Sequence, residues 1–428
     1  MKNNRKNHIG NIAALVLAFA AILLVAFVAR GLVPTEIDDT VETETTTAAT
    51  TTATTTTEAT TAATTVTTEA TTEAEPAEPT AYEQALEILS GMSLREQVYQ
   101  LFIVKPEQIT GSSSKLTEAG RDFEAGLEEY SVGGIVMFAD NIVDRDQTSG
   151  MISAMQSYSA LGLFIAVDEE GGTVARIGNN SAMGTTSFPS MKTIGNTGDT
   201  DEAYNVGYTI GTEIAELGLN LDFAPVADVD SNPDNTVIGN RAFSTVADVA
   251  AEMVAAAVRG FEDSGMLCTL KHFPGHGDTG TDSHLGYTEL DKSLEELYET
   301  EFVPFISGIE AGADLVMVGH ISVPQVTGDD TPASLSATMI GILRDELGFD
   351  GLIITDSMQM EAITDRYTSA EAAVMAIQAG VDIILMPDNL ENAANGIIEA
   401  VENGEISEER IAESVLKILE TKIEAGII

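Results

Sequence analysis

Short apolar runs alternate with longer amphipathic stretches from residue 81 to the last residue. Eight runs are candidate strands: Leu101–Val104, Gly134–Phe138, Leu163–Val167, Leu221–Val226, Cys268–His272, Leu315–Val318, Leu352–Thr355 and Ile383–Met386. Candidate helices between them, rich in Ala, Glu and Leu, include Asp201–Leu217, Val246–Asp263, Ser293–Ala311 and Ala370–Ala379. This alternation predicts an α/β fold with a single (β/α)8 barrel of the TIM type. A doubly wound open sheet is the alternative, but no Gly-x-Gly-x-x-Gly pattern follows an early strand.

Residues 1–30 form a targeting segment that is set apart from the fold. Lys2, Arg5 and Lys6 precede an apolar run, and the 21 residues of Ile9–Ala29 match the roughly 20 that cross a bilayer as a helix. The run ends with Phe27 where a cleavage site needs a small residue. It therefore favours an uncleaved membrane anchor with a cytoplasmic N-terminus over a cleaved signal peptide. Both alternatives export the rest of the chain, to the cell surface or the medium.

Residues 31–80 have the composition of a disordered linker. The stretch Thr35–Thr80 holds 22 Thr and ten acidic residues in 46 positions, and it holds no basic residue. Such a composition cannot form a core, and dispersed acids favour an extended chain. We therefore predict a tether between the anchor and a catalytic domain formed by residues 81–428.

Net charge and cysteine content exclude several classes of protein. The 428 residues include 68 acidic and 20 basic ones, which give a formal charge of −48. This charge repels phosphate backbones and excludes general nucleic-acid binding. The single cysteine, Cys268, excludes an internal disulfide framework and a cysteine-based zinc finger.

Polar residues collect immediately after the predicted strands, where a barrel of this type carries its active site. The positions are Asp140, Asn141, Asp168, Asp228, Asp230, Lys271, His272, His320, Asp356 and Asp388. Helix capping and loop preference explain about half of the Asp and Asn residues. They do not explain Lys271 and His272, which end the fifth apolar run.

The densest chemical feature is the segment 271–284, which reads KHFPGHGDTGTDSH. It holds three of the five histidines of the chain. Asp282 and His284 are two residues apart, so the carboxylate can orient the imidazole as in the supporting half of a catalytic triad. A metal site is the alternative interpretation, with His272, His276, Asp282 and His284 as ligands.

Four segments resemble the β-N-acetylglucosaminidase branch of glycoside hydrolase family three. The first is the His-containing segment, and the others are DEEGGTVAR at 168–176, VIGNRAFS at 237–244 and LRDELGFDGLIITD at 343–356. They occur in the family's order and span most of residues 81–428. Glu169 and Thr173 depart from the Gln and Arg that are commoner in the family.

The resemblance implies a retaining glycosidase that forms a covalent glycosyl-enzyme intermediate. Asp356 matches the nucleophile, and His284, polarised by Asp282, matches the general acid/base. Substrate-binding positions carried over from the motifs are Asp168, Arg176, Arg241, Lys271 and His272. The three bases among them are expected to form a positive spot in an acidic domain.

The expected substrates are N-acetylglucosamine-containing saccharides or muropeptides derived from peptidoglycan or chitin. No cofactor is expected, the membrane is contacted only through the N-terminal segment, and the oligomeric state is left open. Two functions from other classes remain as alternatives: a metal-dependent hydrolase that uses the His-containing segment, and a non-catalytic sugar-binding surface protein.

Overall fold

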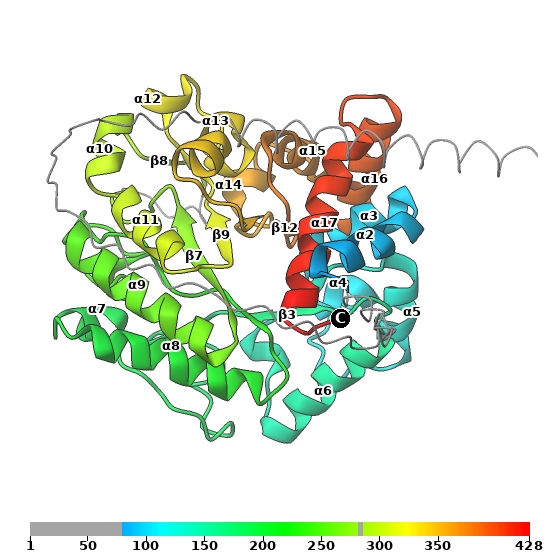
Figure 1. Cartoon of the computed structure of the whole chain (residues 1–428), viewed down its shortest axis with the longest axis horizontal. Coiled ribbons are helices and arrows are strands. Elements are labelled where there is room, and N and C mark those ends of the chain that lie inside the picture. The colour runs from blue at the N-terminus through cyan, green and yellow to red at the C-terminus, as the bar shows by residue number, and fades with distance from the viewer. Residues whose placement is uncertain (1–78, 281–285) are drawn as a thin grey trace, which may run out of the picture. The chain divides into compact units, whose positions relative to one another are not determined.

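A computed structural model describes residues 79–280 and 286–428 of the chain (Figure 1). The predicted anchor and nearly all of the predicted tether lie outside these residues. Within the described ranges, no helix is both long enough and apolar enough to cross a bilayer.

Eight parallel strands form the centre of the described unit, and they pair in the order in which they occur in the chain. Each of them lies within or overlaps one of the eight apolar runs predicted from the sequence. They are β1 (Phe102–Val104), β2 (Gly134–Met137), β3 (Phe164–Val167), β6 (Leu221–Asp222), β7 (Leu267–Phe273), β9 (Leu315–Val318), β11 (Leu352–Thr355) and β12 (Ile384–Leu385).

The eight parallel strands form a nearly closed barrel, in agreement with the predicted α/β barrel. Strand β1 pairs with both β2 and β12, with Ile103 opposite Gly134 on one side and Leu385 on the other. A parallel bridge between Ile354 and Ile383 joins β11 to the start of β12. The backbone N–H of Thr355 donates to Ile383 O at 3.0 Å. The seventh and eighth strands are thus joined by a single bridge and not by a full ladder.

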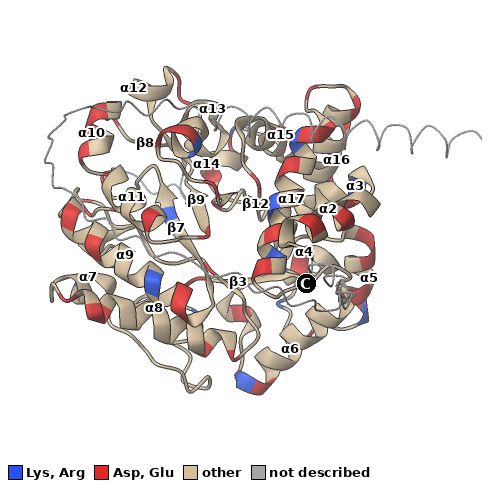
Figure 2. Cartoon of the chain, in the orientation of Figure 1, with Lys and Arg blue, Asp and Glu red and all other residues tan. Residues whose placement is uncertain are grey.

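Helices surround the barrel (Figure 1). The longer ones are α2 (Ala81–Gly91), α5 (Arg121–Tyr130), α6 (Arg145–Tyr158), α8 (Thr200–Ala215), α9 (Ala247–Ser264), α15 (Ser369–Ala379), α16 (Leu390–Glu402) and α17 (Glu408–Glu424). Shorter helices are α3 (Leu94–Gln100), α4 (Pro106–Thr110), α7 (Met191–Gly195), α12 (Pro324–Thr327), α13 (Ala337–Gly341) and α14 (Glu361–Thr364). Acidic residues outnumber basic ones on these helices, as Figure 2 shows.

Local sequence signals set several helix ends. Thr80 and Glu83 form a capping box at the start of α2, and Thr368 and Glu371 form another at the start of α15. Each pair satisfies backbone N–H groups that the first turn leaves without partners. Helix α9 ends at Gly265, whose φ of 75° lies in the left-handed region that glycine enters without strain.

One predicted helix, Ser293–Ala311, is two helices in the structure. Helix α10 covers Leu294–Glu299 and α11 covers Phe302–Glu310. Pro304 lacks an N–H group, and its ring clashes with the carbonyl four residues earlier in a continuous helix. That carbonyl belongs to Thr300, where the chain leaves helical geometry with φ −134° and ψ −71°.

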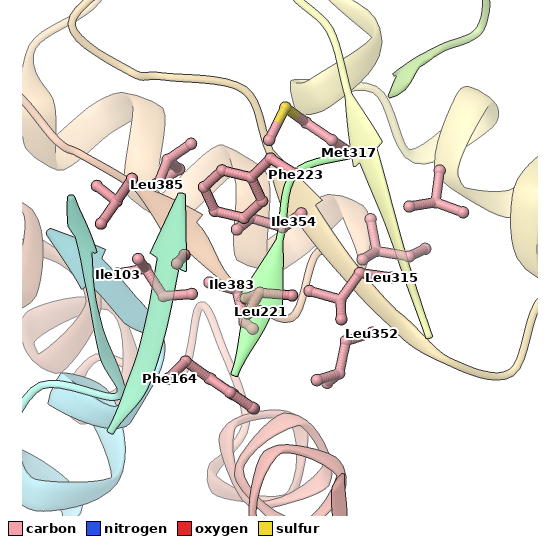
Figure 3. Close-up of a cluster of buried hydrophobic side chains, with 14 of the residues drawn as sticks. Ile103, Phe164, Leu221, Phe223, Leu315, Met317, Leu352, Ile354, Ile383 and Leu385 are labelled. Carbon is pink, nitrogen blue, oxygen red and sulfur yellow. The ribbon is translucent and has the colours of Figure 1, made fainter. Parts of the chain in front are cut away.

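Alternate residues of the strands fill the barrel. Figure 3 shows the side chains of Leu221 and Phe223, Leu315 and Met317, Leu352 and Ile354, and Ile383 and Leu385 converging between the strands. The spacing of two along each strand puts these residues on one face. The barrel centre is therefore a packed apolar core, and a cavity can form only beyond the strand ends.

The amino-terminal end of the barrel is sealed around Phe164. Lys422 of α17 is completely buried and places its Nζ 5.1 Å from the centre of the Phe164 ring. Its ammonium donates to Gln100 Oε1 at 3.0 Å and to Gly162 O at 2.9 Å. Burial lowers the pKa of Lys422 to about 7. Lys422 thus joins α17 to the residues that precede β1 and β3.

Candidate active site

A cavity of about 760 Å³ lies at the carboxyl-terminal ends of the strands. Six of the eight predicted site residues line it: Asp168, Arg176, Arg241, Lys271, His272 and Asp356. The other two, Asp282 and His284, lie outside the described residues. Val136, Phe223, Met317 and Leu385 also line the cavity, so the top of the apolar core forms its floor.

The alternation of strand residues carries polar side chains into this cavity. Asp356 follows β11 at the same spacing as Leu352 and Ile354, both of which lie inside the barrel (Figure 3). Its backbone N–H donates to Val318 O at 2.9 Å, and its Oδ1 accepts the N–H of Ser357 at 2.7 Å. The carboxylate is thus held at the strand end with its position fixed by main-chain contacts.

Strand β7 contributes two neighbouring residues to the cavity, although neighbours on a regular strand face opposite ways. Its pairing with β9 shifts register between Lys271 and Phe273. An irregularity of this kind redirects side chains at the end of a strand. Lys271 and His272 both line the cavity as a result.

Two carboxylates and three cations form a connected network along one wall. Lys271 Nζ lies 2.8 Å from Asp168 Oδ1 and 2.7 Å from Glu170 Oε1. Arg241 binds Glu170 through two parallel contacts of 2.9 and 2.7 Å. Arg176 Nη2 lies 3.3 Å from Asp168 Oδ2. The network holds the cationic side chains in place before any ligand arrives.

Glu170 is the main residue that sequence reasoning missed. It belongs to the β4 (Glu169–Gly171) and β5 (Val174–Ala175) hairpin directly after Asp168. Burial alone raises the pKa of Glu170, but the charges of Lys271 and Arg241 outweigh this effect and hold the pKa well below its usual value. The sequence shows two adjacent glutamates in this motif, but only their contacts in the structure show which one pairs with the cations. Glu169 instead accepts the N–H groups of Ile177 and Gly178, and burial raises the pKa of Glu169 to about 6.

We expect Glu170→Gln to destabilise the protein and to lower its activity together. The variant leaves Arg241 and Lys271 buried with one carboxylate fewer, and breaking a buried ion pair costs about 3–5 kcal/mol. Urea unfolding measures this loss, and kcat/KM on a chromogenic substrate should fall about 100-fold. Asp140→Asn is the matched control, because the Lys115–Asp140 pair in the same cavity is exposed and should cost less than about 1 kcal/mol. Equal effects of the two variants would contradict the role given to Glu170.

His272 is oriented by a second carboxylate that sequence reasoning did not assign. Its Nδ1 lies 2.8 Å from Asp228 Oδ2, and Asp228 Oδ1 also accepts the backbone N–H groups of His272 and His276 at 3.2 and 2.6 Å. With the Nδ1 proton donated to Asp228, Nε2 is free to accept from Arg241 Nη2 at 3.3 Å. Asp228 therefore sets the tautomer and the direction of this imidazole.

The start of the His-containing segment is fixed by close backbone packing. Buried Asn235 donates through Nδ2 to His276 O at 2.7 Å and to Thr279 O at 3.2 Å, and its Oδ1 accepts the N–H groups of Val237 and Ile238. A Cβ on Gly277 would lie 1.8 Å from Val229 O, so only glycine fits there. The turn that carries Arg241 and the segment that leads to Asp282 are thus joined.

The cavity is not the positive spot that the sequence suggested. Its lining holds five basic and five acidic residues: Lys105, Lys115, Arg176, Arg241 and Lys271, and Glu107, Asp140, Asp168, Glu170 and Asp356. The formal charges cancel, and four of the five basic residues pair with a carboxylate of the same lining. The lining still concentrates five of the 16 basic residues that follow residue 80.

Not every polar residue at a strand end belongs to the site. Asp140 and Asn141 line the cavity. Asp230 instead pairs with Lys192 at 2.6 Å, and His320 contacts Ser334 Oγ at 2.7 Å while its Nε2 donates to Ser357 O. Asp388 is exposed to solvent.

The metal interpretation gains no support from the residues that can be compared. Over 79–280 and 286–428, no group of three or more His, Cys, Asp and Glu side chains has the arrangement of a metal site. Two of its four proposed ligands lie outside those ranges. Of the other two, His272 uses Nδ1 with Asp228, and His276 uses Nδ1 with Thr279 Oγ1 at 2.7 Å.

Known proteins resemble this chain in both sequence and structure. Beta-hexosaminidase A of Pseudoalteromonas piscicida is 36% identical over 326 residues, which cover 69% of this chain and 54% of that protein. Beta-hexosaminidase LpqI of Mycobacterium tuberculosis is 34% identical over 310 residues, which cover 70% of this chain and 78% of that protein. The chain thus spans about half the length of the first relative.

A solved structure gives the same result. The glycoside hydrolase family 3 β-N-acetylglucosaminidase from Paenibacillus sp. str. FPU-7 superposes with a TM-score of 0.74 at 37% identity, over 79% of this chain and 63% of that one. Residues 93–421 match the Glycosyl hydrolase family 3 N terminal domain. With this match over most of the chain, and with the predicted barrel in place, the protein belongs to glycosyl hydrolase family 3.

Proposed function

We propose that this protein is an exported, retaining exo-β-N-acetylhexosaminidase. It removes terminal β-linked N-acetylhexosamine from peptidoglycan- or chitin-derived fragments. The observation that carries the proposal is the position of Asp356, which lines the cavity at a strand end together with the cation–carboxylate network of Asp168, Glu170, Arg241 and Lys271. The beta-hexosaminidase names of the relatives support the choice of sugar.

In the first step, the Asp356 carboxylate attacks the anomeric carbon and the bond to the leaving oxygen breaks. His284, in its protonated form and oriented by Asp282, gives its proton to that oxygen. In the second step, neutral His284 takes a proton from water, which attacks the same carbon and releases Asp356. An imidazole has an ordinary pKa of about 6.5, so it can serve in both directions near neutral pH.

The terminal sugar is held by the network wall. Asp168 accepts hydrogen bonds from ring hydroxyls, Arg176, Arg241 and Lys271 donate to hydroxyls and to the acetamido oxygen, and His272 Nε2 accepts from a hydroxyl. Because these side chains are already fixed by Glu170 and Asp228, binding costs little reorganisation.

Export and surface attachment belong to the same proposal. They rest on the basic and apolar pattern of residues 1–30 and on the Thr-rich composition of residues 31–80. A domain tethered outside the cytoplasm meets wall fragments and foreign polysaccharides directly. Fractionation of cells that produce the full chain tests this part of the proposal separately from activity.

A panel of nitrophenyl β-glycosides, with and without phosphate and a chelator, tests the activity. We expect the 2-acetamido sugars to be cleaved much faster than glucoside or xyloside, and we expect the chelator to have no effect. Loss of activity with the chelator supports a metal-dependent hydrolase instead, and binding without turnover supports a sugar-binding surface protein. A sugar 1-phosphate product formed in phosphate identifies phosphorolysis.

A further inference from the structure

Lys105 stands apart from the other basic residues of the cavity. Among the described residues, Arg176, Arg241 and Lys271 meet the carboxylates of Asp168 and Glu170, and Lys115 meets Asp140. The Lys105 ammonium meets no carboxylate within these ranges. Its Nζ donates to the neutral amide oxygen of Gln359 at 2.7 Å. This cation lies in the cavity wall with two of its three donors available to a ligand.

The strand pairings place Lys105 in one layer with three residues already assigned to the site. In an eight-stranded barrel of this type, each layer of the interior holds four side chains, one from every second strand. Because the strands are staggered, the layer member on the next contributing strand lies two residues beyond the residue that the strand pairings lead to. From Lys271 the pairings lead through Met317 to Ile354, which is two residues before Asp356. Continuing the Ile354–Ile383 bridge by two residues leads from Asp356 to Leu385, which pairs with Ile103, two residues before Lys105.

The remaining pairings complete the same layer. Continuing the β1–β2 register by one residue leads from Lys105 to Val136, which pairs with Ala166, two residues before Asp168. Continuing the β3–β6 and β6–β7 registers by one residue leads from Asp168 through Phe223 to Thr269, two residues before Lys271. The uppermost layer of the barrel is therefore Lys105, Asp168, Lys271 and Asp356, and only Lys105 has no role so far.

The contact of Lys105 ties it to the loop that follows Asp356. Gln359, whose amide oxygen accepts the hydrogen bond of Lys105, follows Asp356 by three residues. The loop that begins at Lys105 continues to Ser112, Ser113 and Ser114, which also line the cavity and are exposed or partly exposed. In the proposed binding mode, the terminal sugar occupies the network wall and the rest of the saccharide extends past this side. Lys105 is thus positioned to meet the sugar that leaves.

We propose that Lys105 is a specificity-determining residue that binds a carboxylate on the leaving sugar, so that acidic saccharides are preferred over neutral ones. The inference rests on the proposed function and narrows it, because chitin-derived fragments carry no carboxylate. In a domain with about 42 more acidic than basic residues, an anionic substrate is repelled at long range. A cation that no internal carboxylate neutralises offsets that repulsion at one point of the cavity.

Two disaccharides that differ in one group test the inference. The first is β-1,4-linked di-N-acetylglucosamine, and the second is the same disaccharide with a 3-O-lactyl ether on the reducing sugar. We expect the wild-type ratio of kcat/KM, acidic over neutral, to fall about fivefold in Lys105→Gln, the effect of one partly screened charge pair. Lys105→Arg should retain the ratio, and high salt should lower the wild-type ratio.

Lys115→Gln is the matched control, because Lys115 lines the same cavity but already pairs with Asp140. Its ratio should equal that of the wild type. An unchanged ratio in Lys105→Gln, or an equal loss on both disaccharides, overturns the inference while the proposed function stands. A wild-type protein that cleaves neither disaccharide nor a nitrophenyl N-acetylglucosaminide refutes the proposed function itself. Thermal unfolding of each variant separates these outcomes from a failure to fold.

Discussion

Asp356→Asn should reduce turnover at least about 10⁴-fold on every substrate, because an amide cannot form the glycosyl ester through which the reaction passes. The fold and sugar affinity should persist, since Asn keeps the size of the side chain and an oxygen for the Ser357 N–H group. Single-turnover kinetics measures the loss, and isothermal titration with a sugar measures the retained binding.

A 2-fluoro glycoside with an activated leaving group provides the direct assay for the same residue. The fluorine slows breakdown of the intermediate, and mass spectrometry of peptides should find the label on Asp356. Asp365→Asn is the control, because Asp365 is exposed and lies in the same segment. This variant should still be labelled on Asp356, and its turnover should equal that of the wild type. A label on any other carboxylate removes Asp356 from the role of nucleophile.

His284→Ala should lose much more activity on substrates with a poor leaving group than on substrates with a good one. The second sugar of a natural disaccharide is a poor leaving group as an alkoxide. It needs a proton from a general acid, and this catalysis is worth about 10²–10⁴-fold in rate. A nitrophenolate leaves without that proton, so the first step on a nitrophenyl glycoside should be largely retained. Comparison of kcat/KM on the two substrates measures the difference.

Asp282→Asn tests the partner of this histidine. It should show the same dependence on the leaving group in milder form, because the imidazole remains but its tautomer is no longer fixed. If the two residues bound a metal instead, either substitution would lower activity on all substrates alike, and added zinc would restore part of it. Equal losses together with rescue by zinc exclude the proposed dyad.

The fold could be predicted largely because each barrel strand is an apolar run with a polar residue after it. A buried parallel strand needs apolar residues on both faces, and this requirement is visible in runs such as Leu352–Thr355. The break between α10 and α11 was missed because Pro304 lies in an otherwise continuous helical pattern. Its effect on the Thr300 carbonyl is a backbone constraint that amphipathic spacing does not reveal.

The site was predictable to the extent that its residues occupy motif positions. Asp168 and Asp356 directly follow strands, and Lys271 lies near the end of β7, so all three reach the cavity from positions that the apolar runs mark. Glu170, Asp228 and Asn235 could not be assigned, because their roles depend on partners 41 to 101 positions away in the chain. Only the folded structure shows which of 68 acidic residues meets a buried cation.

The closure of the barrel has a consequence for the time that folding takes. Strand β1 pairs with β12, so Phe102 lies opposite Ile384, about 280 residues later in the chain. At the usual rate of synthesis of about 5–20 residues per second, roughly 15–60 s pass between the two strands. Contacts of such long range form slowly, and an unclosed sheet presents free edges and its apolar inner face to other chains. A chain that ends before Leu385 should therefore aggregate during synthesis, even though it keeps Asp168, Lys271 and Asp356.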